Sequence, residues 1–142
     1  MMIPTSRFGE VEVAEDEILE FPDGLLGFPA LKRYVLLPNP KGGPFLWLQS
    51  LEDPAIAFVV VDPADFFKEY KVSVRPEDVG PIRLTDASQG RVVVILTVPG
   101  DPREITANLQ GPIILNVKDR LGRQLVLGEP GLTTRHKLMA GA

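Results

Sequence analysis

The feature that most constrains the fold of this chain is the even scatter of glycine and proline. Thirteen Gly and fourteen Pro are spread over 142 residues, so no apolar pattern runs for three helical turns without an interruption. Both residues destabilise helix interiors, whereas turns between short strands accommodate them readily. The spacing therefore predicts an all-β chain, and the length predicts a single domain.

Two neighbouring runs predict a β-hairpin. Glu10–Val13 alternates polar and apolar residues, and Glu17–Phe21 follows after a three-residue turn. Seven further runs are predicted strands: Arg33–Leu37, Phe45–Ser50, Ile56–Val61, Tyr70–Val74, Arg91–Val98, Ile113–Val117 and Arg123–Leu127. Each strand must bury a face, and a closed barrel or a sandwich achieves this while limiting exposed edges. We therefore expect an antiparallel β-barrel-like or sandwich fold.

Helix is expected only in short connectors between strands. Pro63–Lys68 and Arg75–Val79 each have proline near the first helical position, and Asp62 is a suitable N-cap for the first of them. Both segments are long enough for about one turn only.

Two of the predicted strands are apolar on both faces, at Phe58–Val61 and Val92–Leu96. A strand of this kind needs a cover on each side, because large exposed apolar patches are uncommon on monomers. The favoured interpretation is that the connector containing Phe66 and Phe67 packs across them. The alternative is that their outer side is a docking surface for another protein.

Composition excludes several kinds of chemistry. The chain has no cysteine and a single histidine, His136, so disulfides, Cys-based zinc sites, iron–sulfur clusters and thiolate nucleophiles are ruled out. The glycine pairs do not form a P-loop, and the aspartates do not follow a calcium-loop pattern. We expect no cofactor, no metal and no enzymatic activity. The alternative is a small β-barrel ligand-binding protein or enzyme using Glu52, Asp62 or Asp65, which requires a pocket with a carboxylate of raised pKa.

Charge and hydropathy bear on partners and location. The formal net charge is −4, and the aromatic run Phe45–Leu48 has no neighbouring Lys or Arg. The aromatic–basic neighbours at Arg33–Tyr34 and Lys68–Lys71 are isolated, so we expect no direct nucleic-acid binding. A binder of single-stranded nucleic acid stays open as a weaker alternative. The start of the chain lacks the pattern of a secretory signal, and no apolar run approaches the ~20 residues that span a bilayer. We therefore expect a cytoplasmic protein that does not bind membranes.

Amide side chains beside apolar strands are the candidate recognition residues. Asn108, Gln110 and Asn116 surround an aliphatic run, and Gln49 ends another. A buried amide must find hydrogen-bond partners, so these residues either anchor loop backbone or line a recognition surface. With the apolar residues beside Gln49, the predicted partner-binding set is Phe45, Leu46, Gln49, Asn108, Gln110 and Asn116.

Several of these segments together resemble the FliW family of flagellar assembly factors. The segments are Phe21–Phe28 (FPDGLLGF), Pro44–Ser50 (PFLWLQS), Ala57–Phe58 with Asp62–Pro63, and Thr106–Ile113 (TANLQGPI) with Asn116 and Gln124. Their order and spacing match the family from about Phe8 to Arg135, and the run Thr106–Ile113 is the most specific piece.

The resemblance implies a fold, a function and partners. It implies a β-barrel domain, placed here at residues 1–130, with residues 131–142 as a flexible C-terminal tail. It also implies a non-enzymatic cytoplasmic regulator, monomeric when free, that binds flagellin before export. When flagellin has left, such a regulator binds the RNA-binding protein CsrA and antagonises it allosterically, which relieves repression of flagellin mRNA translation.

Overall fold

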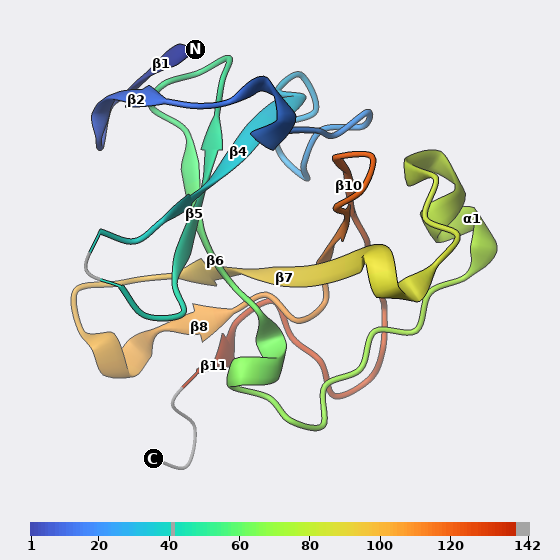
Figure 1. The fold of residues 1–142 in the computed structure, drawn as a ribbon. Coiled ribbons are helices and arrows are strands. Elements are labelled where there is room, and N and C mark those ends of the chain that lie inside the picture. Colours follow the sequence, from blue (N-terminus) through green and yellow to red (C-terminus); the bar gives the residue numbers. More distant parts are fainter. Residues whose placement is uncertain (41, 139–142) are drawn as a thin grey trace.

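Seven strands close into a barrel in the computed structural model, which describes residues 1–40 and 42–138 (Figure 1). In order around the barrel the strands are β7 (Gly90–Thr97), β6 (Ala57–Val61), β5 (Leu46–Ser50), β4 (Arg33–Pro38), β3 (Ile18–Glu20), β10 (Leu121–Gln124) and β9 (Ile113–Asn116). β9 pairs with β7 and closes the ring. The predicted all-β barrel is confirmed.

Strand β7 is long enough to have two neighbours along one edge. Its first half, Gly90–Val93, pairs with β9, and its end pairs with β8 (Thr106–Ala107). β11 (His136–Lys137) extends the sheet beyond β8. All pairs are antiparallel except that between β3 and β10, which is parallel and consists of the single pair Glu20 and Leu121.

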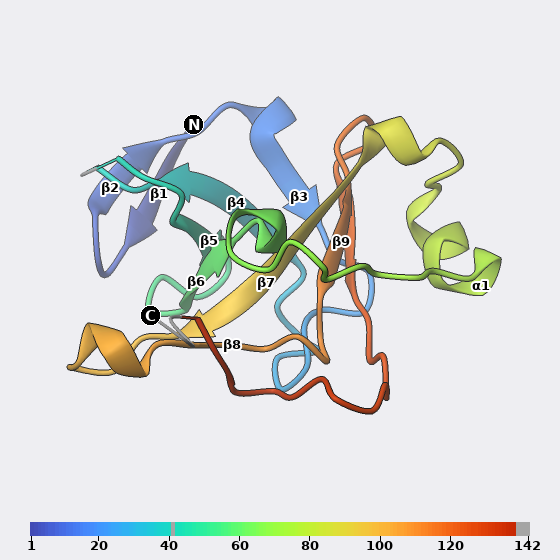
Figure 2. The same cartoon turned by 90° about the horizontal axis from the view of Figure 1, so that it is seen from below.

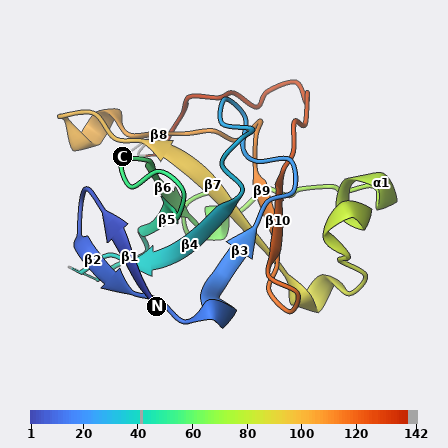
Figure 3. The same ribbon diagram turned by 90° about the horizontal axis from the view of Figure 1, so that it is seen from above.

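The predicted hairpin of Glu10–Val13 with Glu17–Phe21 is wrong. β2 (Gly9–Glu12) pairs instead with β1 (Met2–Thr5), a strand that the sequence reasoning missed. The 3-10 helix η1 (Glu15–Glu17) then redirects the chain, and β3 pairs with β4. The β1–β2 ribbon lies beside β4 (Figure 3), where Ile3, Val13 and Val35 form a small buried cluster.

Two other strand predictions differ from the structure. Residues 70–74 form no strand; the Tyr70 side chain packs on the outer cluster instead, and its hydroxyl donates to the Leu109 carbonyl at 2.6 Å. The strand predicted at Arg123–Leu127 lies earlier, as β10. Beyond β10 the chain is still held, since the amides of Leu125 and Leu127 donate to the carbonyls of Pro112 and Gln110.

The helical connectors are short, as predicted. η2 (Pro63–Asp65) is capped by Asp62, whose Oδ1 accepts from the Ala64 amide at 2.9 Å. α1 (Pro76–Val79) is the second predicted connector. Three further 3-10 turns are η3 (Gly80–Ile82), η4 (Ala87–Gln89) and η5 (Pro102–Glu104). No helix within the described ranges has the length and apolar character needed to cross a bilayer.

The barrel interior holds the main core. Its fully buried members include Phe21, Tyr34, Leu48, Val93 and Leu115. Phe21 and Tyr34 meet edge to face, with ring centroids 5.3 Å apart. Gly122 on β10 allows this packing, because a Cβ there would lie 2.5 Å from the Phe21 ring.

The end of the chain belongs to the sheet further than expected. The predicted tail begins at residue 131, yet β11 pairs with β8, Leu138 is buried, and Leu132 packs on the same outer cluster. The part of the tail up to residue 138 is thus an integral part of the fold, because it covers apolar strand surface. Residues 139–142 lie outside the described part of the chain.

Candidate protein-docking site

The two strands that are apolar on both faces lie next to each other, as β6 and β7. Alternation sends Phe58, Val60, Val93 and Ile95 toward the barrel core, and sends their neighbours to the outer face. On that face, Val61 and Val94 are fully buried and Leu96 nearly so. The half-buried Phe66 and Phe67 pack against them. The predicted cover by the connector is therefore confirmed, and Figure 2 shows η2 in front of β7.

The cover ends partway along the two strands, where the strands also separate. The β6–β7 ladder runs from the pair Val61–Val94 to the pair Val59–Leu96 and stops there. Beyond that point Ala57 and Phe58 pair only with β5, while Thr97 pairs only with β8. A wedge between β6 and β7 is the result.

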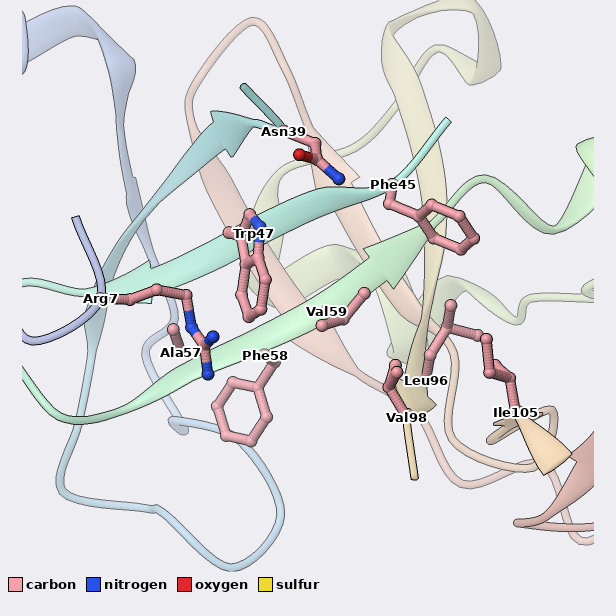
Figure 4. A pocket seen from close by; sticks show the side chains of 10 residues that line it. All are labelled: Arg7, Asn39, Phe45, Trp47, Ala57, Phe58, Val59, Leu96, Val98 and Ile105. Carbon is pink, nitrogen blue, oxygen red and sulfur yellow. The ribbon is translucent and has the colours of Figure 1, made fainter. Parts of the chain in front are cut away.

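A groove of about 430 Å³ lies at this wedge on the outside of the barrel (Figure 4). Apolar side chains from four strands and their ends form most of its lining. The ten lining residues are Arg7, Asn39, Phe45, Trp47, Ala57, Phe58, Val59, Leu96, Val98 and Ile105. Val98 is 53% exposed, so the groove presents apolar surface to solvent.

One end of the groove carries a positive charge. The Arg7 guanidinium lies 4.3 Å from the centroid of the Trp47 ring, and Phe8 meets the same ring edge to face. The β1–β2 turn positions both residues, because Thr5 Oγ1 accepts from the Phe8 amide and donates to the Gly9 carbonyl. Within residues 1–40 and 42–138, no carboxylate forms an ion pair with Arg7.

Of the predicted recognition residues, only Phe45 lines the groove. Its ring stacks on Phe66 with centroids 6.1 Å apart, so it joins the groove to the covered half. Leu46 packs against the barrel core instead. The sequence reasoning missed Trp47, which alternation places on the same face as Phe45. It also missed Arg7, because strand β1 was not predicted.

Two of the predicted amides are inside the protein. Gln49 is 0% exposed, and its Nε2 lies within 3.0–3.2 Å of the carbonyls of Ser50, Pro54 and Ile56. Asn116 is 1% exposed. Its Nδ2 donates to the Ile82 carbonyl, and its Oδ1 accepts from the amides of the β9–β10 turn. Neither side chain can touch a partner while the fold is intact, and both anchor loops.

The other two amides are half-buried and also hold backbone. Asn108 Oδ1 accepts from the Gly111 amide at 2.9 Å. Gln110 bridges to a distant loop, since its Nε2 donates to the carbonyls of Glu129 and Leu132 and its Oε1 accepts from the Glu129 amide. The anchoring interpretation accounts for the bonds of both residues.

The carboxylates of the enzymatic alternative do not gather in the groove. Glu52 Oε1 accepts from the amides of Arg33 and Lys32, at 2.8 and 2.6 Å, and these bonds hold the pKa of Glu52 below its ordinary value. Asp62 caps η2, and Asp65 lies within that turn. A general acid needs a raised pKa, so Glu52 is poorly suited to that role.

Comparison with known proteins assigns the family. The FliW protein family model matches residues 2–138. A flagellar assembly factor FliW from Natranaerobius thermophilus is 42% identical over 97% of this chain and 92% of its own length. Another from Bdellovibrio bacteriovorus is 43% identical, over 97% and 79%.

The fold agrees with an experimental structure of the same family. A crystal structure of the flagellar assembly factor FliW superposes with a TM-score of 0.90 at 36% identity, covering 97% of this chain and 96% of that one. Sequence and fold agree over nearly the whole length of the chain. The chain therefore belongs to the FliW family of flagellar assembly factors.

Proposed function

We propose that this flagellar assembly factor is a non-catalytic, cytoplasmic adaptor that switches between two protein partners. It binds flagellin before export, and when free of flagellin it binds CsrA and antagonises that repressor allosterically. The observation that carries the proposal is the apolar groove at the β6–β7 wedge. Exposed apolar grooves on soluble proteins mark interaction sites, and none of the described residues that line this groove is a carboxylate.

The charge distribution supports a basic second partner. Residues 10–20 contain six carboxylates and no Lys or Arg, more negative charge than the net −4 of the whole chain. All six are exposed, on β2, η1 and β3: Glu10, Glu12, Glu15, Asp16, Glu17 and Glu20. A surface of this kind attracts a basic RNA-binding protein and repels RNA itself.

Partner exchange needs no chemical step. If occupancy by one ligand lowers the affinity for the other, the outcome follows from their concentrations and dissociation constants. To weaken the hold of CsrA on RNA, the adaptor must bind the RNA-free state of CsrA more tightly than the RNA-bound state.

Isothermal titration of the purified protein with flagellin monomers and with CsrA tests the proposal. We expect each to bind with a dissociation constant in the micromolar range or tighter, and saturating flagellin to weaken CsrA binding at least tenfold. In a filter assay the protein should lower the affinity of CsrA for RNA without binding RNA itself. Absence of binding to both partners at tens of micromolar would overturn the proposal.

A further inference from the structure

We infer that the groove at the β6–β7 wedge accepts an extended apolar segment of flagellin, whose main chain pairs with the open edge of β6 and whose carboxylate meets Arg7. The inference rests on the proposed function for the identity of the partner. Three features carry it. They are the stretch of the β6 edge that no described strand pairs with, the apolar walls, and the Arg7 guanidinium, which forms no ion pair within residues 1–40 and 42–138.

The open edge supplies main-chain partners. Ala57 and Phe58 pair with Gln49 and Leu48 on one side, and the β6–β7 ladder does not extend to them on the other. Successive residues of a strand direct their N–H and C=O groups to opposite edges, so one of the two residues presents both groups to the wedge. An added strand would satisfy them, which is the usual way in which extended peptides dock on a sheet.

The apolar residues that line the groove can contact every second side chain of such an added strand. Val59 and Leu96 lie where the ladder stops, and Val98 and Ile105 lie beyond it on the β7–β8 side. Phe45 and Trp47 form the β5 side (Figure 4). In an extended segment every second side chain faces the same way, about 7 Å apart, so alternate apolar residues would enter the groove.

Arg7 selects the charge of the segment. Its guanidinium is held against the face of Trp47, which orients the planar group at the end of the groove. A carboxylate of the incoming segment would gain a charge-assisted hydrogen bond there, and a basic segment would be repelled. The groove therefore favours a segment that carries a carboxylate over a basic one, and the carboxylates of residues 10–20 are better suited to the basic partner.

The first test is a matched pair of lysine substitutions at exposed valines. Val98→Lys places a charge in the groove, and Val126→Lys places the same charge at a site that is 71% exposed and does not line the groove. In titrations with flagellin monomers we expect V98K to weaken binding at least tenfold and V126K less than twofold. Circular dichroism and melting show that both variants are folded.

The second test probes the charge of Arg7 and the main chain of β6. Arg7→Glu should weaken flagellin binding at least threefold, whereas Arg135→Glu, outside the groove, should not change it. Hydrogen exchange should show that the complex protects the amide of Ala57 or Phe58 that faces the wedge.

The outcomes separate this inference from the proposed function. If the wild-type protein binds flagellin and V98K and R7E bind equally well, the groove is not the site, while the proposed function stands. Weakened binding without new amide protection would overturn the added strand. If the wild-type protein binds no flagellin, the partner is wrong and the inference falls with it.

Discussion

The outer β6–β7 face is apolar along its whole length, but one half is covered by other segments of the chain and the other half is open to solvent. In one half, Val61 and Val94 are fully buried beneath Phe66 and Phe67. In the other half, Val98 is 53% exposed, and the neighbouring strand has turned away. Alternating apolar residues on a strand thus indicate a face that needs a cover, but they do not indicate whether the chain itself supplies it.

The segments that cover the buried half come from distant parts of the chain. The connector after β6 contributes Phe66 and Phe67, and the C-terminal end contributes Leu132 and Leu138. Hydrogen bonds of Tyr70 and Gln110 hold these segments in place. At one end of the uncovered half lies the β1–β2 turn, with Arg7 over Trp47. The covered half therefore contributes to stability, and the open half is the proposed binding region.

The largest expected effect comes from placing a charge in each half. Val94→Asp buries a carboxylate beneath the cover and should cost about 4 kcal/mol or more, whereas Val98→Asp should change stability by about 0.5 kcal/mol or less. Urea unfolding followed by circular dichroism measures both. Val94→Thr, which retains the side-chain shape, should cost about 1–3 kcal/mol and keeps the comparison measurable if V94D does not fold. Equal losses for V94D and V98D would show that the halves do not differ.

Removing the bridge from Gln110 should loosen the cover without touching the groove. Gln110→Ala deletes three hydrogen bonds to the backbone of Glu129 and Leu132, and we expect a loss of about 1–3 kcal/mol. Hydrogen exchange should speed up in residues 129–138, while flagellin affinity stays within twofold of wild type. A large loss of affinity with unchanged stability would instead place Gln110 in partner recognition.

Alkaline pH should weaken the covered half through Tyr70. Burial raises the pKa of Tyr70 from 10.0 to about 12, so the unfolded chain loses this proton at lower pH than the folded protein does. The stabilisation is complete below about pH 10 and is lost as the pH rises toward 12. Tyr70→Phe should cost about 1 kcal/mol at pH 7, because the hydroxyl donates to Leu109. It should also make the free energy of unfolding less dependent on pH as the pH rises from 10 toward 12.

Unfolding free energies at several pH values from 8 to 12 measure this effect for both proteins. Burial also raises the pKa of Tyr34 to about 12, so some alkaline loss should persist in Y70F. Identical slopes for the wild type and Y70F would assign the whole loss to other groups.

The smallest expected effect is at Asn108, whose Oδ1 accepts a hydrogen bond from the Gly111 amide. Asn108→Ala should lower the free energy of unfolding by about 0.5–1.5 kcal/mol, since the amide is only half-buried. Flagellin binding should be unchanged. Weakened binding at unchanged melting temperature would return Asn108 to the recognition surface.

The residues of the predicted recognition set lie in different surroundings, for physical reasons. Phe45 lines the groove, and its position on the outer face follows from strand alternation, which is a local property. Gln49 and Asn116 were expected at a recognition surface and are buried. An amide beside an apolar strand has the same sequence pattern whether it anchors a loop or faces a partner. Only the positions of the carbonyls of Pro54 and Ile82 distinguish the two roles.

Residues of the family motifs also make contacts that hold the fold together. Gln124 Oε1 accepts from the Leu26 amide, and its Nε2 donates to the Gly111 carbonyl, so this residue links the Phe21–Phe28 segment to the Thr106–Ile113 segment. Gly24, in the first of these segments, has a φ of +66°, and a Cβ there would lie 2.6 Å from the Phe28 carbonyl oxygen. Gln124 and Gly24, two of the residues that carry the resemblance, thus have structural roles in these segments.

The sequence by itself determined the all-β class, the short capped connectors and the family, because strand alternation, Asp62 capping and motif order depend on neighbouring residues. Only the tertiary structure decided which strands close the barrel, that β2 pairs with β1, and which half of the β6–β7 face stays open. Those outcomes depend on contacts between residues far apart in the chain, such as Phe66 with the buried cluster that includes Val94, and Arg7 with Trp47. The free energy of such contacts depends on three-dimensional packing, which no local pattern encodes.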